Sequence, residues 1–476
     1  MYKAFMHLFH MNDKYYVYDV NTKVVLNISK NIYIFLNNEN EEVLTDDEKN
    51  YFNCLKNEGF FLNKYVIETE HPETKKLPYY IKYNMSYLIL QVTQNCNLRC
   101  DYCVYSGGYK TRGHSQKKMS FSLAKKGIDY LIEHSTNSQN LVLGFYGGEP
   151  LLEISLIKKC VEYIEARVED KDIWYSITTN ATLLRLDVID FLVKHNFKIT
   201  LSIDGPQSLH DKNRKYAGSD EGSFNNIIEN LKLFVEKYPI YFENNITVNT
   251  VLDASRGFKI ISDFFKSNEI FEKINIRASL ISDDYSGKEH IVCEQYKIES
   301  RYEEFILYLA ALNRIDKKFV SPLLRNSLAD ISRLKLGTRY CHRDMIEEKS
   351  HHGGPCVPGG DRLFLTTDGT LYPCEKVCEL SELAKLGNIY EGINLIYAEK
   401  MLNIEKLTAS KCHHCWAYDF CDVCIRLADN NESNLAKNIA CQCIKTKREL
   451  EETIKDYIFL KEQGYDFETM EYIKRS

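Results

Sequence analysis

The chain has 476 residues, of which 44% are hydrophobic and 27% are charged, so it is expected to be globular with two or three domains. Its net charge of −6 excludes a broad basic surface for nucleic acid, and no apolar run approaches the ~20 residues of a membrane span. The sixteen cysteines, with no signal-peptide pattern before them, favour metal sites in a reducing cytoplasmic compartment over a disulfide framework.

Residues 1–85 are predicted to form a separate winged-helix-like module. Two turn-forming pairs, ND and NT, separate three β-prone runs, FMHLFHM, KYYVYDV and KVVLNIS. Helical patterns follow over residues 31–36 and 45–54, the second with a capping sequence at its start. The polar segment ETEHPETKKLPYY, which contains two prolines, is predicted to be a linker.

From residue 86 to about 315, β-prone runs alternate with amphipathic segments. The six runs are SYLILQVT, NLVLGFYGG, IWYSITTN, FKITLSIDG, NNITVNTVL and KINIRASLI. The alternation predicts an α/β fold of parallel strands, whose active-site loops follow the C-terminal strand ends. Residues 316–445 are predicted to form a separate cysteine-rich domain, since from about residue 340 the sequence is rich in Gly, Pro and Cys, as expected where metal ligands replace an apolar core. Residues 446–476 are predicted to form a charged C-terminal helix.

The segment CNLRCDYC directly follows the first of these strands. It holds Cys96, Cys100 and Cys103 in the pattern C-x3-C-x2-C. Three thiols this close cannot all pair with one another, and they suit a metal centre better than a disulfide. Zinc ions and cubane iron–sulfur clusters normally take four protein ligands. The loop therefore either borrows a distant ligand, as in a zinc knuckle, or leaves one metal corner open for chemistry.

With Tyr102 before its last cysteine, this loop resembles that of the radical S-adenosylmethionine (SAM) enzymes. The resemblance implies a partial (β/α)6 barrel and a [4Fe–4S] cluster on the three cysteines, whose fourth iron binds SAM while the tyrosine packs near the adenine. The end of the next strand matches the family's GGEP motif, whose backbone and acid receive the methionine ammonium. Its residues are Gly147, Gly148, Glu149 and Pro150. Two glycines allow backbone to approach a ligand closely.

Two further strand ends resemble the same family. TTNATLL is similar to TNGTLL, with Ala181 in place of the usual glycine, and the resemblance implies that Asn180 faces SAM. LSIDGPQSLHDKNR is similar to a SIDGP…HD…R stretch, which implies that Ser202 and Asp204 meet the ribose or methionine end of SAM and Arg214 its carboxylate. The alternative for each residue is a strand cap or a surface ion pair.

The late cysteines resemble the SPASM extension, which holds two auxiliary [4Fe–4S] clusters. One gap differs, since two residues instead of the usual three separate Cys421 from Cys424. The family's interleaving implies a first cluster on Cys356, Cys374 and Cys424, completed by Cys341, by Cys378 or by an open corner. It implies a second cluster on Cys412, Cys415, Cys421 and Cys443, the last preferred to Cys441 because it opens a basic helix in the family. Structural zinc is the alternative at residues 412–424.

Together these resemblances imply a radical SAM peptide maturase, most similar to maturases of cysteine-rich ribosomal peptides. Its N-terminal module would bind the leader of a precursor peptide as an extra strand. A donor such as flavodoxin or ferredoxin would supply an electron, and SAM cleavage would give a 5′-deoxyadenosyl radical that takes a hydrogen from the peptide. A thioether or carbon–carbon crosslink would follow.

Two other functions remain open at this point. An anaerobic sulfatase-maturating enzyme oxidises Ser or Cys to formylglycine and usually has an aspartate base after YPC, where this chain has Glu375. A non-catalytic zinc-binding winged-helix protein would leave the GGEP motif without a purpose. DNA binding by the module is disfavoured, because residues 1–30 carry only four lysines as fixed cations.

Overall fold

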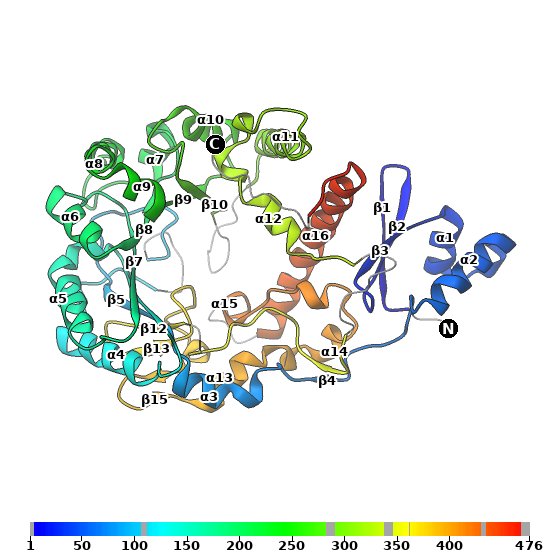
Figure 1. Cartoon of the computed structure of the whole chain (residues 1–476), viewed down its shortest axis with the longest axis horizontal. Coiled ribbons are helices and arrows are strands. Elements are labelled where there is room, and N and C mark those ends of the chain that lie inside the picture. Colours follow the sequence, from blue (N-terminus) through cyan, green and yellow to red (C-terminus); the bar gives the residue numbers. More distant parts are fainter. Residues whose placement is uncertain are drawn as a thin grey trace.

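The computed structural model describes residues 4–105, 112–281, 291–337, 346–360, 362–429 and 435–467. The chain forms a barrel-like α/β core, a cysteine-containing region beside it and a small N-terminal module at the far end (Figure 1). Among the described residues, no helix is long and apolar enough to cross a membrane.

The N-terminal module is a three-stranded antiparallel sheet with two helices on one face. Its elements are β1 (Met6–Met11), β2 (Lys14–Asp19), β3 (Val24–Ile28), α1 (Lys30–Asn38) and α2 (Asp46–Asn57). Thr45 and Glu48 form a reciprocal capping box at the start of α2. A core that includes Leu26, Phe52 and Leu55 joins sheet and helices. The predicted strands and helices of the module are confirmed.

The predicted linker is partly wrong. After β4 (Glu68–Thr69), the chain forms α3 (Leu77–Tyr83), with a proline in its first turn. Leu77 and Ile81 lie four residues apart, on one face of this helix, and are buried in the core of the barrel. The burial of this apolar pair outweighs the polar composition that favoured a linker.

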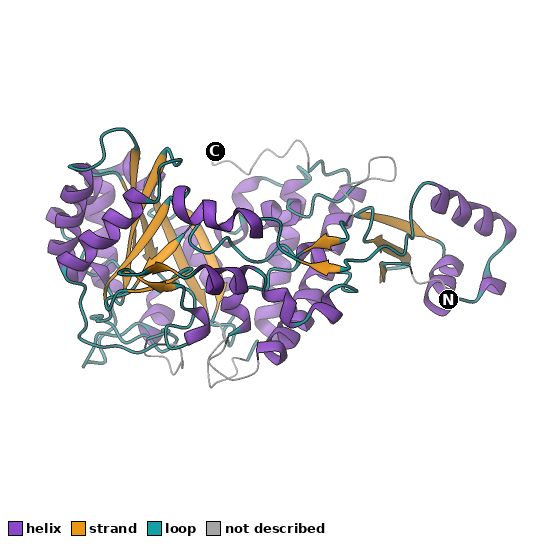
Figure 2. Cartoon of the chain, turned by 90° about the horizontal axis from the view of Figure 1, so that it is seen from below, coloured by secondary structure: helices purple, strands orange, loops and turns teal. Residues whose placement is uncertain are grey.

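The core confirms the six predicted strands, all parallel to their neighbours. They are β5 (Tyr87–Thr93), β6 (Asn140–Gly147), β7 (Asp172–Thr179), β8 (Phe197–Ser202), β9 (Ile246–Leu252) and β10 (Asn275–Leu280). Helices cover the outside of these strands (Figure 2), and leucine, isoleucine and valine fill the space between. The helices are α4 (Phe121–Glu133), α5 (Ile154–Glu165), α6 (Leu186–Lys194), α7 (Gln207–Asn213), α8 (Phe224–Lys237), α9 (Pro239–Asn245), α10 (Lys259–Ser267) and α11 (Glu294–Ala311). The next helix, α12 (Ser327–Ser332), instead packs in a second apolar cluster.

The cysteine-containing region adds short strands to the free edge of β5. The sheet order is β10-β9-β8-β7-β6-β5-β12-β13-β14-β15, and β12 runs parallel to β5. These strands are β12 (Leu363–Leu365), β13 (Thr370–Tyr372), β14 (Gly387–Asn388) and β15 (Gly392–Ile393), while β11 (Lys349–Ser350) pairs with β4. The remaining helices are α13 (Leu395–Leu402), α14 (Ala409–Cys412), α15 (Ile425–Ala428) and α16 (Leu435–Glu462).

Helix α16 lies between the barrel and the N-terminal sheet (Figure 1). Phe9 and Tyr18 of the sheet share a buried cluster with Ile454 and Tyr457 of this helix. The helix begins at Leu435 rather than near residue 446, so Cys441 and Cys443 lie inside it. The expectation that Cys443 opens the helix is therefore wrong.

Candidate active site

The three-cysteine loop follows β5 and is held against the end of β6. The amides of Gly148 and Glu149 donate to the carbonyls of Thr93 and Asn95, at 3.0 and 2.9 Å. A Cβ atom on Gly147 would lie 2.1 Å from the Thr93 oxygen, and one on Gly148 equally close to the oxygen of Asn95. Only glycine allows this contact, so GGEP fixes the position of the chain that leads into Cys96.

A second segment holds the other side of the loop. The amides of Arg99 and Asp101 donate to the carbonyls of Lys215 and Asn213, at 2.8 and 3.1 Å. The amide of Ala217 donates to Asn97 at 2.8 Å. Backbone hydrogen bonds thus fix the loop on both sides without using its thiols.

The three thiols lie together and their surroundings fit a metal cluster. Burial, together with the nearby Glu149, Cys100 and Cys103, raises the pKa of the Cys96 thiol to about 12. The Leu98 amide points at the sulfur of Cys96 at 3.3 Å, and the Tyr105 amide at that of Cys103 at 3.4 Å. Backbone donors aimed at cysteine sulfurs are typical of iron–sulfur sites, where they stabilise thiolate charge.

Glu149 and Asn180 meet beside this loop. The Glu149 side chain is 1% exposed and accepts hydrogen bonds from Leu151, Thr179 and the Asn180 amide, at 2.7–3.0 Å. Burial raises the pKa of its carboxyl to about 7. The Asn180 side chain points at the Cys96 sulfur, at 3.8 Å. Ala181 has φ +64°, a conformation that favours glycine, which explains why it stands at a glycine position of the motif.

Asp204 and Arg214 pair with each other. Nε and Nη2 of Arg214 donate to the two carboxylate oxygens of Asp204 at 2.9 and 3.0 Å. The hydroxyl of Tyr102 also donates to Asp204, and the guanidinium lies 5.4 Å from the centre of its ring. The structure brings these three predicted residues together as a brace for the cysteine loop. Ser202 is half-buried at the end of β8, and Pro150 is buried where β6 leads into α5.

The late cysteines form two groups. Burial, with nearby Cys443, Cys415 and Cys412, raises the pKa of Cys421 to about 12. In the other group, burial raises the pKa of Cys374, and nearby Cys424 adds to this shift. Burial also raises the pKa of Cys424, and nearby Cys356 adds to that shift. The assignment of these two groups to two clusters remains a prediction.

The other candidate cysteines, Cys441, Cys378 and Cys341, do not belong to either group in the part of the chain that the structure describes. Cys441 is exposed on α16, whereas Cys443 lies in the group with Cys412, Cys415 and Cys421. Cys378 is buried near Asp429 and Arg112. Cys341 lies outside the described residues.

Glu375 is partly buried and lies near Tyr87 of β5 and Tyr146 of β6. Its carboxylate pairs with Arg362 at 3.3 Å, and its charge raises the pKa values of Tyr87 and Tyr146, which burial already raises. An acid in this place can reach a substrate in the barrel only after leaving its arginine partner.

A second buried ion pair, between Arg112 and Glu379, was not predicted from the sequence. Arg112 and Glu379 lie 3.1 Å apart, and both side chains are less than a tenth exposed. Arg112 also donates to the carbonyls of Glu375 and Val377 at 2.7 Å, so it fixes the backbone beside Glu375. No motif links these residues, because more than 260 positions separate them.

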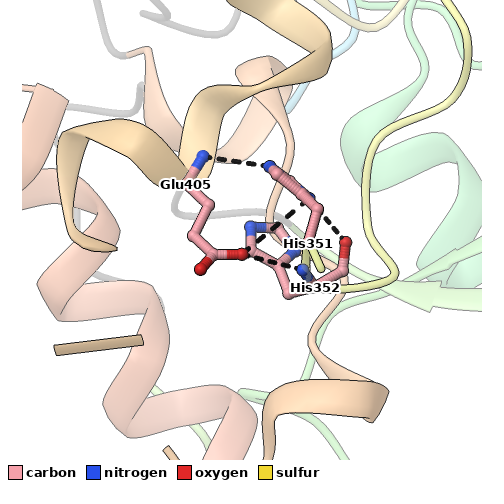
Figure 3. A group of neighbouring side chains, drawn as sticks. All are labelled: His351, His352 and Glu405. Carbon is pink, nitrogen blue, oxygen red and sulfur yellow. Dashed lines mark hydrogen bonds and ion pairs between the residues drawn. The ribbon is translucent and has the colours of Figure 1, made fainter. Parts of the chain in front are cut away.

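His351, His352 and Glu405 form a buried group (Figure 3). This group lies near Cys412, whose pKa the Glu405 carboxylate raises. The Glu405 amide donates to His351 at 3.2 Å, and the Glu405 carboxylate accepts from the His352 amide at 2.8 Å. Thr69 and Tyr418 donate to the other carboxylate oxygen. Burial lowers the pKa of His351 to about 4. Since each of these side chains already has a hydrogen-bonding partner, the group is a structural clamp rather than a metal site.

Comparison with known proteins shows which family the barrel resembles. Residues 90–252 match the Radical SAM superfamily. A cysteine-type anaerobic sulfatase-maturating enzyme of Clostridium novyi is 27% identical over 383 residues, or 76% of this chain and 94% of that one. The radical SAM cyclopropyl synthase TigE of Paramaledivibacter caminithermalis is 29% identical over 173 residues, 34% of each chain.

Solved structures show the same fold. Native anSMEcpe with bound AdoMet superposes with a TM-score of 0.58 at 20% identity, covering 78% of this chain and 99% of that one. The structure of the same protein with bound AdoMet and the Cp18Cys peptide superposes with a TM-score of 0.57 at 21% identity. That superposition covers 79% of this chain and 99% of the other. Residues 90–252 thus form a radical SAM domain, and the chain is similar over most of its length to an anaerobic sulfatase-maturating enzyme and over about a third of it to TigE.

Proposed function

We propose that this enzyme is a peptide maturase that installs a thioether or carbon–carbon crosslink in a ribosomally made precursor. The observation that supports this most is the N-terminal sheet with its two helices, which has its own core. The fold of anSMEcpe is matched over 99% of its length by 78% of this chain, so about a fifth of this chain is additional. A sheet with exposed edges can bind a leader peptide as an added strand.

The residues of the three-cysteine loop have distinct roles in this proposal. Cys96, Cys100 and Cys103 would hold a [4Fe–4S] cluster, which together with SAM supplies a 5′-deoxyadenosyl radical when an electron donor such as flavodoxin or ferredoxin reduces it. Glu149 would bind the SAM ammonium, because its carboxylate is buried without a cationic side chain in hydrogen-bonding contact. Asp204 and Arg214 would orient Tyr102 toward the adenine.

The two late thiol groups would hold auxiliary clusters. Cys412, Cys415, Cys421 and Cys443 provide the four thiolates that a cubane cluster needs. Cys356, Cys374 and Cys424 provide three, with Cys341, Cys378 or an open corner as the fourth position. A substrate thiolate would fit an open corner, and this would favour thioether formation.

Sulfatase maturation is the second candidate function. It is favoured by the match to the Clostridium novyi enzyme over 94% of its length and by Glu375 beside a proposed cluster ligand. In that case Glu375 would leave Arg362 to act as the base.

Anaerobic reconstitution tests both functions. The purified chain would receive iron, sulfide, SAM and dithionite, and 5′-deoxyadenosine would be measured. Small peptides encoded beside this gene would be compared with a cysteine-containing sulfatase peptide. A crosslink removes two hydrogen atoms from the first kind, whereas formylglycine formation replaces the cysteine sulfur of the second with oxygen. Formylglycine without crosslinking would overturn the proposed function.

A further inference from the structure

The last strand of the barrel, β10, has one edge without a strand partner among the described residues. It stands at one end of the ten-stranded sheet, and β9 is the strand of the described residues that pairs with it. The Ile281 amide donates to Leu252 of the β9 strand at 3.1 Å. Since backbone groups point alternately to either side of a strand, those of Ala278 and Leu280 face outward. No described residue hydrogen-bonds to them there, and residues 277–280 are all exposed.

A large cavity lies along this edge. Its volume is about 960 Å³, and it is bounded by β10, α11 and α12. Phe258 and Tyr296 contribute apolar surface, and Ser300 and Ser327 contribute hydroxyl groups. An added strand lies about 4.8 Å from its neighbour and rises about 3.3 Å per residue, so an extended segment of four or five residues fits the length of this edge.

The cavity lies between segments that contact the candidate active site and the N-terminal module. On one side, the amide of Val251 donates to Asp204 at 3.1 Å, and Val251 is in register with Ser279 of β10. On the other side, Lys335 lines the cavity, and two residues later Gly337 donates to Lys23, which precedes β3, at 2.9 Å. A peptide bound to the N-terminal sheet and threaded toward the barrel would therefore pass along this edge.

We propose that the outer edge of β10 binds an extended segment of the peptide substrate as an added β-strand, with the substrate side chains in the adjoining cavity. This inference rests on the proposed function. It adds a binding site for the segment of the peptide that lies between the leader and the residue that reacts. Unpaired strand edges readily pair with another chain, and natural proteins usually block them. Main-chain hydrogen bonds would provide affinity for many sequences, and the cavity would select side chains.

The test uses the full-length enzyme, reconstituted with iron and sulfide, in the presence of SAM. The probe is a displayed library of 20-residue peptides with one fixed central cysteine, selected for binding. The selected peptide should bind Ala278→Pro about tenfold more weakly than wild type, because proline lacks the outward N–H. It should bind the matched control Ala278→Val within about twofold, because valine keeps the N–H and favours strands.

Hydrogen exchange of the wild-type protein provides a second measurement that does not depend on a variant folding. The selected peptide should slow exchange of the outward amides of Ala278 and Leu280. Unchanged exchange there, equal affinity for Ala278→Pro and wild type, or a library that yields no binder would each overturn the inference. SAM cleavage with dithionite alone tests the function separately. An enzyme that modifies the peptide without protecting β10 refutes this site only, whereas absence of 5′-deoxyadenosine refutes the function.

Discussion

The barrel and the cysteine-containing region are built on different physical principles. In the barrel, six strands of six to eight residues share one apolar core, and most of its members are almost completely buried. In the region from residue 346 to 429, the strands are two or three residues long, and most of the cysteines are only half-buried. Burial of apolar surface stabilises the first region, whereas the second is expected to depend on metal ligation. Loss of metal should therefore abolish chemistry in the barrel and structure in the other region.

The largest effect is expected from replacing Cys96, Cys100 and Cys103 together with alanine. SAM cleavage should be abolished, because no ligand for the reactive cluster remains. The fold should persist, since backbone hydrogen bonds hold the loop on both sides. About two thirds of the iron should remain if three clusters are present. The measurements are 5′-deoxyadenosine, bound iron and the circular dichroism spectrum, and unchanged 5′-deoxyadenosine would refute the assignment.

The next largest effect is expected from Cys415→Ala in the other region. It should remove about four irons per chain and lower the melting temperature, because ligation replaces an apolar core there. Cys441→Ala is the matched control: this exposed cysteine should change stability by less than about 0.5 kcal/mol. Iron content and thermal unfolding measure both. If Cys441→Ala also loses a cluster, Cys441 rather than Cys443 is the ligand.

A smaller effect is expected from Glu149→Gln. The substitution keeps size but removes the charge proposed to bind the SAM ammonium, so the KM for SAM should rise about tenfold. Thr179→Val removes only one hydrogen bond to this carboxylate, at 2.7 Å, and should raise the KM about twofold. Both are measured by the SAM dependence of 5′-deoxyadenosine formation. Equal effects of the two substitutions would argue against an ionic role for Glu149.

The smallest effect is expected from Asp456→Asn on α16. It tests whether contacts with α11, rather than metal ligation, contribute to the stability of this helix. Burial raises the pKa of Asp456 to about 6, and Tyr308 of α11 hydrogen-bonds to it. Because the folded-state pKa is raised, the stability that this group contributes is present below about pH 4 and is lost as pH rises through about 6. Asp456→Asn should therefore stabilise the protein by about 1 kcal/mol at pH 8.5 and by much less at about pH 4, where the native carboxyl is protonated and the unfolded one is only half ionised.

Thermal unfolding at the two pH values provides this measurement. Tyr308→Phe is the control, because it removes the hydroxyl while leaving the carboxyl in place. A stabilisation by Asp456→Asn that is equal at both pH values would show that the charge of Asp456 is not its cause.

Periodic apolar patterns predicted most of the fold, and local motifs predicted which cysteines gather. The sequence did not predict α3, because this short helix has only two buried apolar residues, Leu77 and Ile81, and polar residues precede it. It did not place the start of α16, since its first turns carry cysteines without an apolar period. It also did not predict that Asp204 and Arg214 pair with each other, or that Arg112 meets Glu379. Such ion pairs depend on how strands and loops meet in space, which local spacing does not encode.

Helix α16 has a consequence for when the enzyme is ready to act. Cys443 lies near its start, while Glu451 contacts His7 at 2.9 Å and Glu462 contacts Lys14 at 2.6 Å on the N-terminal sheet. The His7 ring also stacks on Trp416, the neighbour of Cys415, at 3.8 Å. If Cys412, Cys415, Cys421 and Cys443 hold a cluster, α16 links metal loading to the position of the N-terminal sheet, which is proposed to bind the leader peptide. An incompletely assembled enzyme would then capture substrate poorly, which would keep precursor away from a catalyst that cannot finish the reaction.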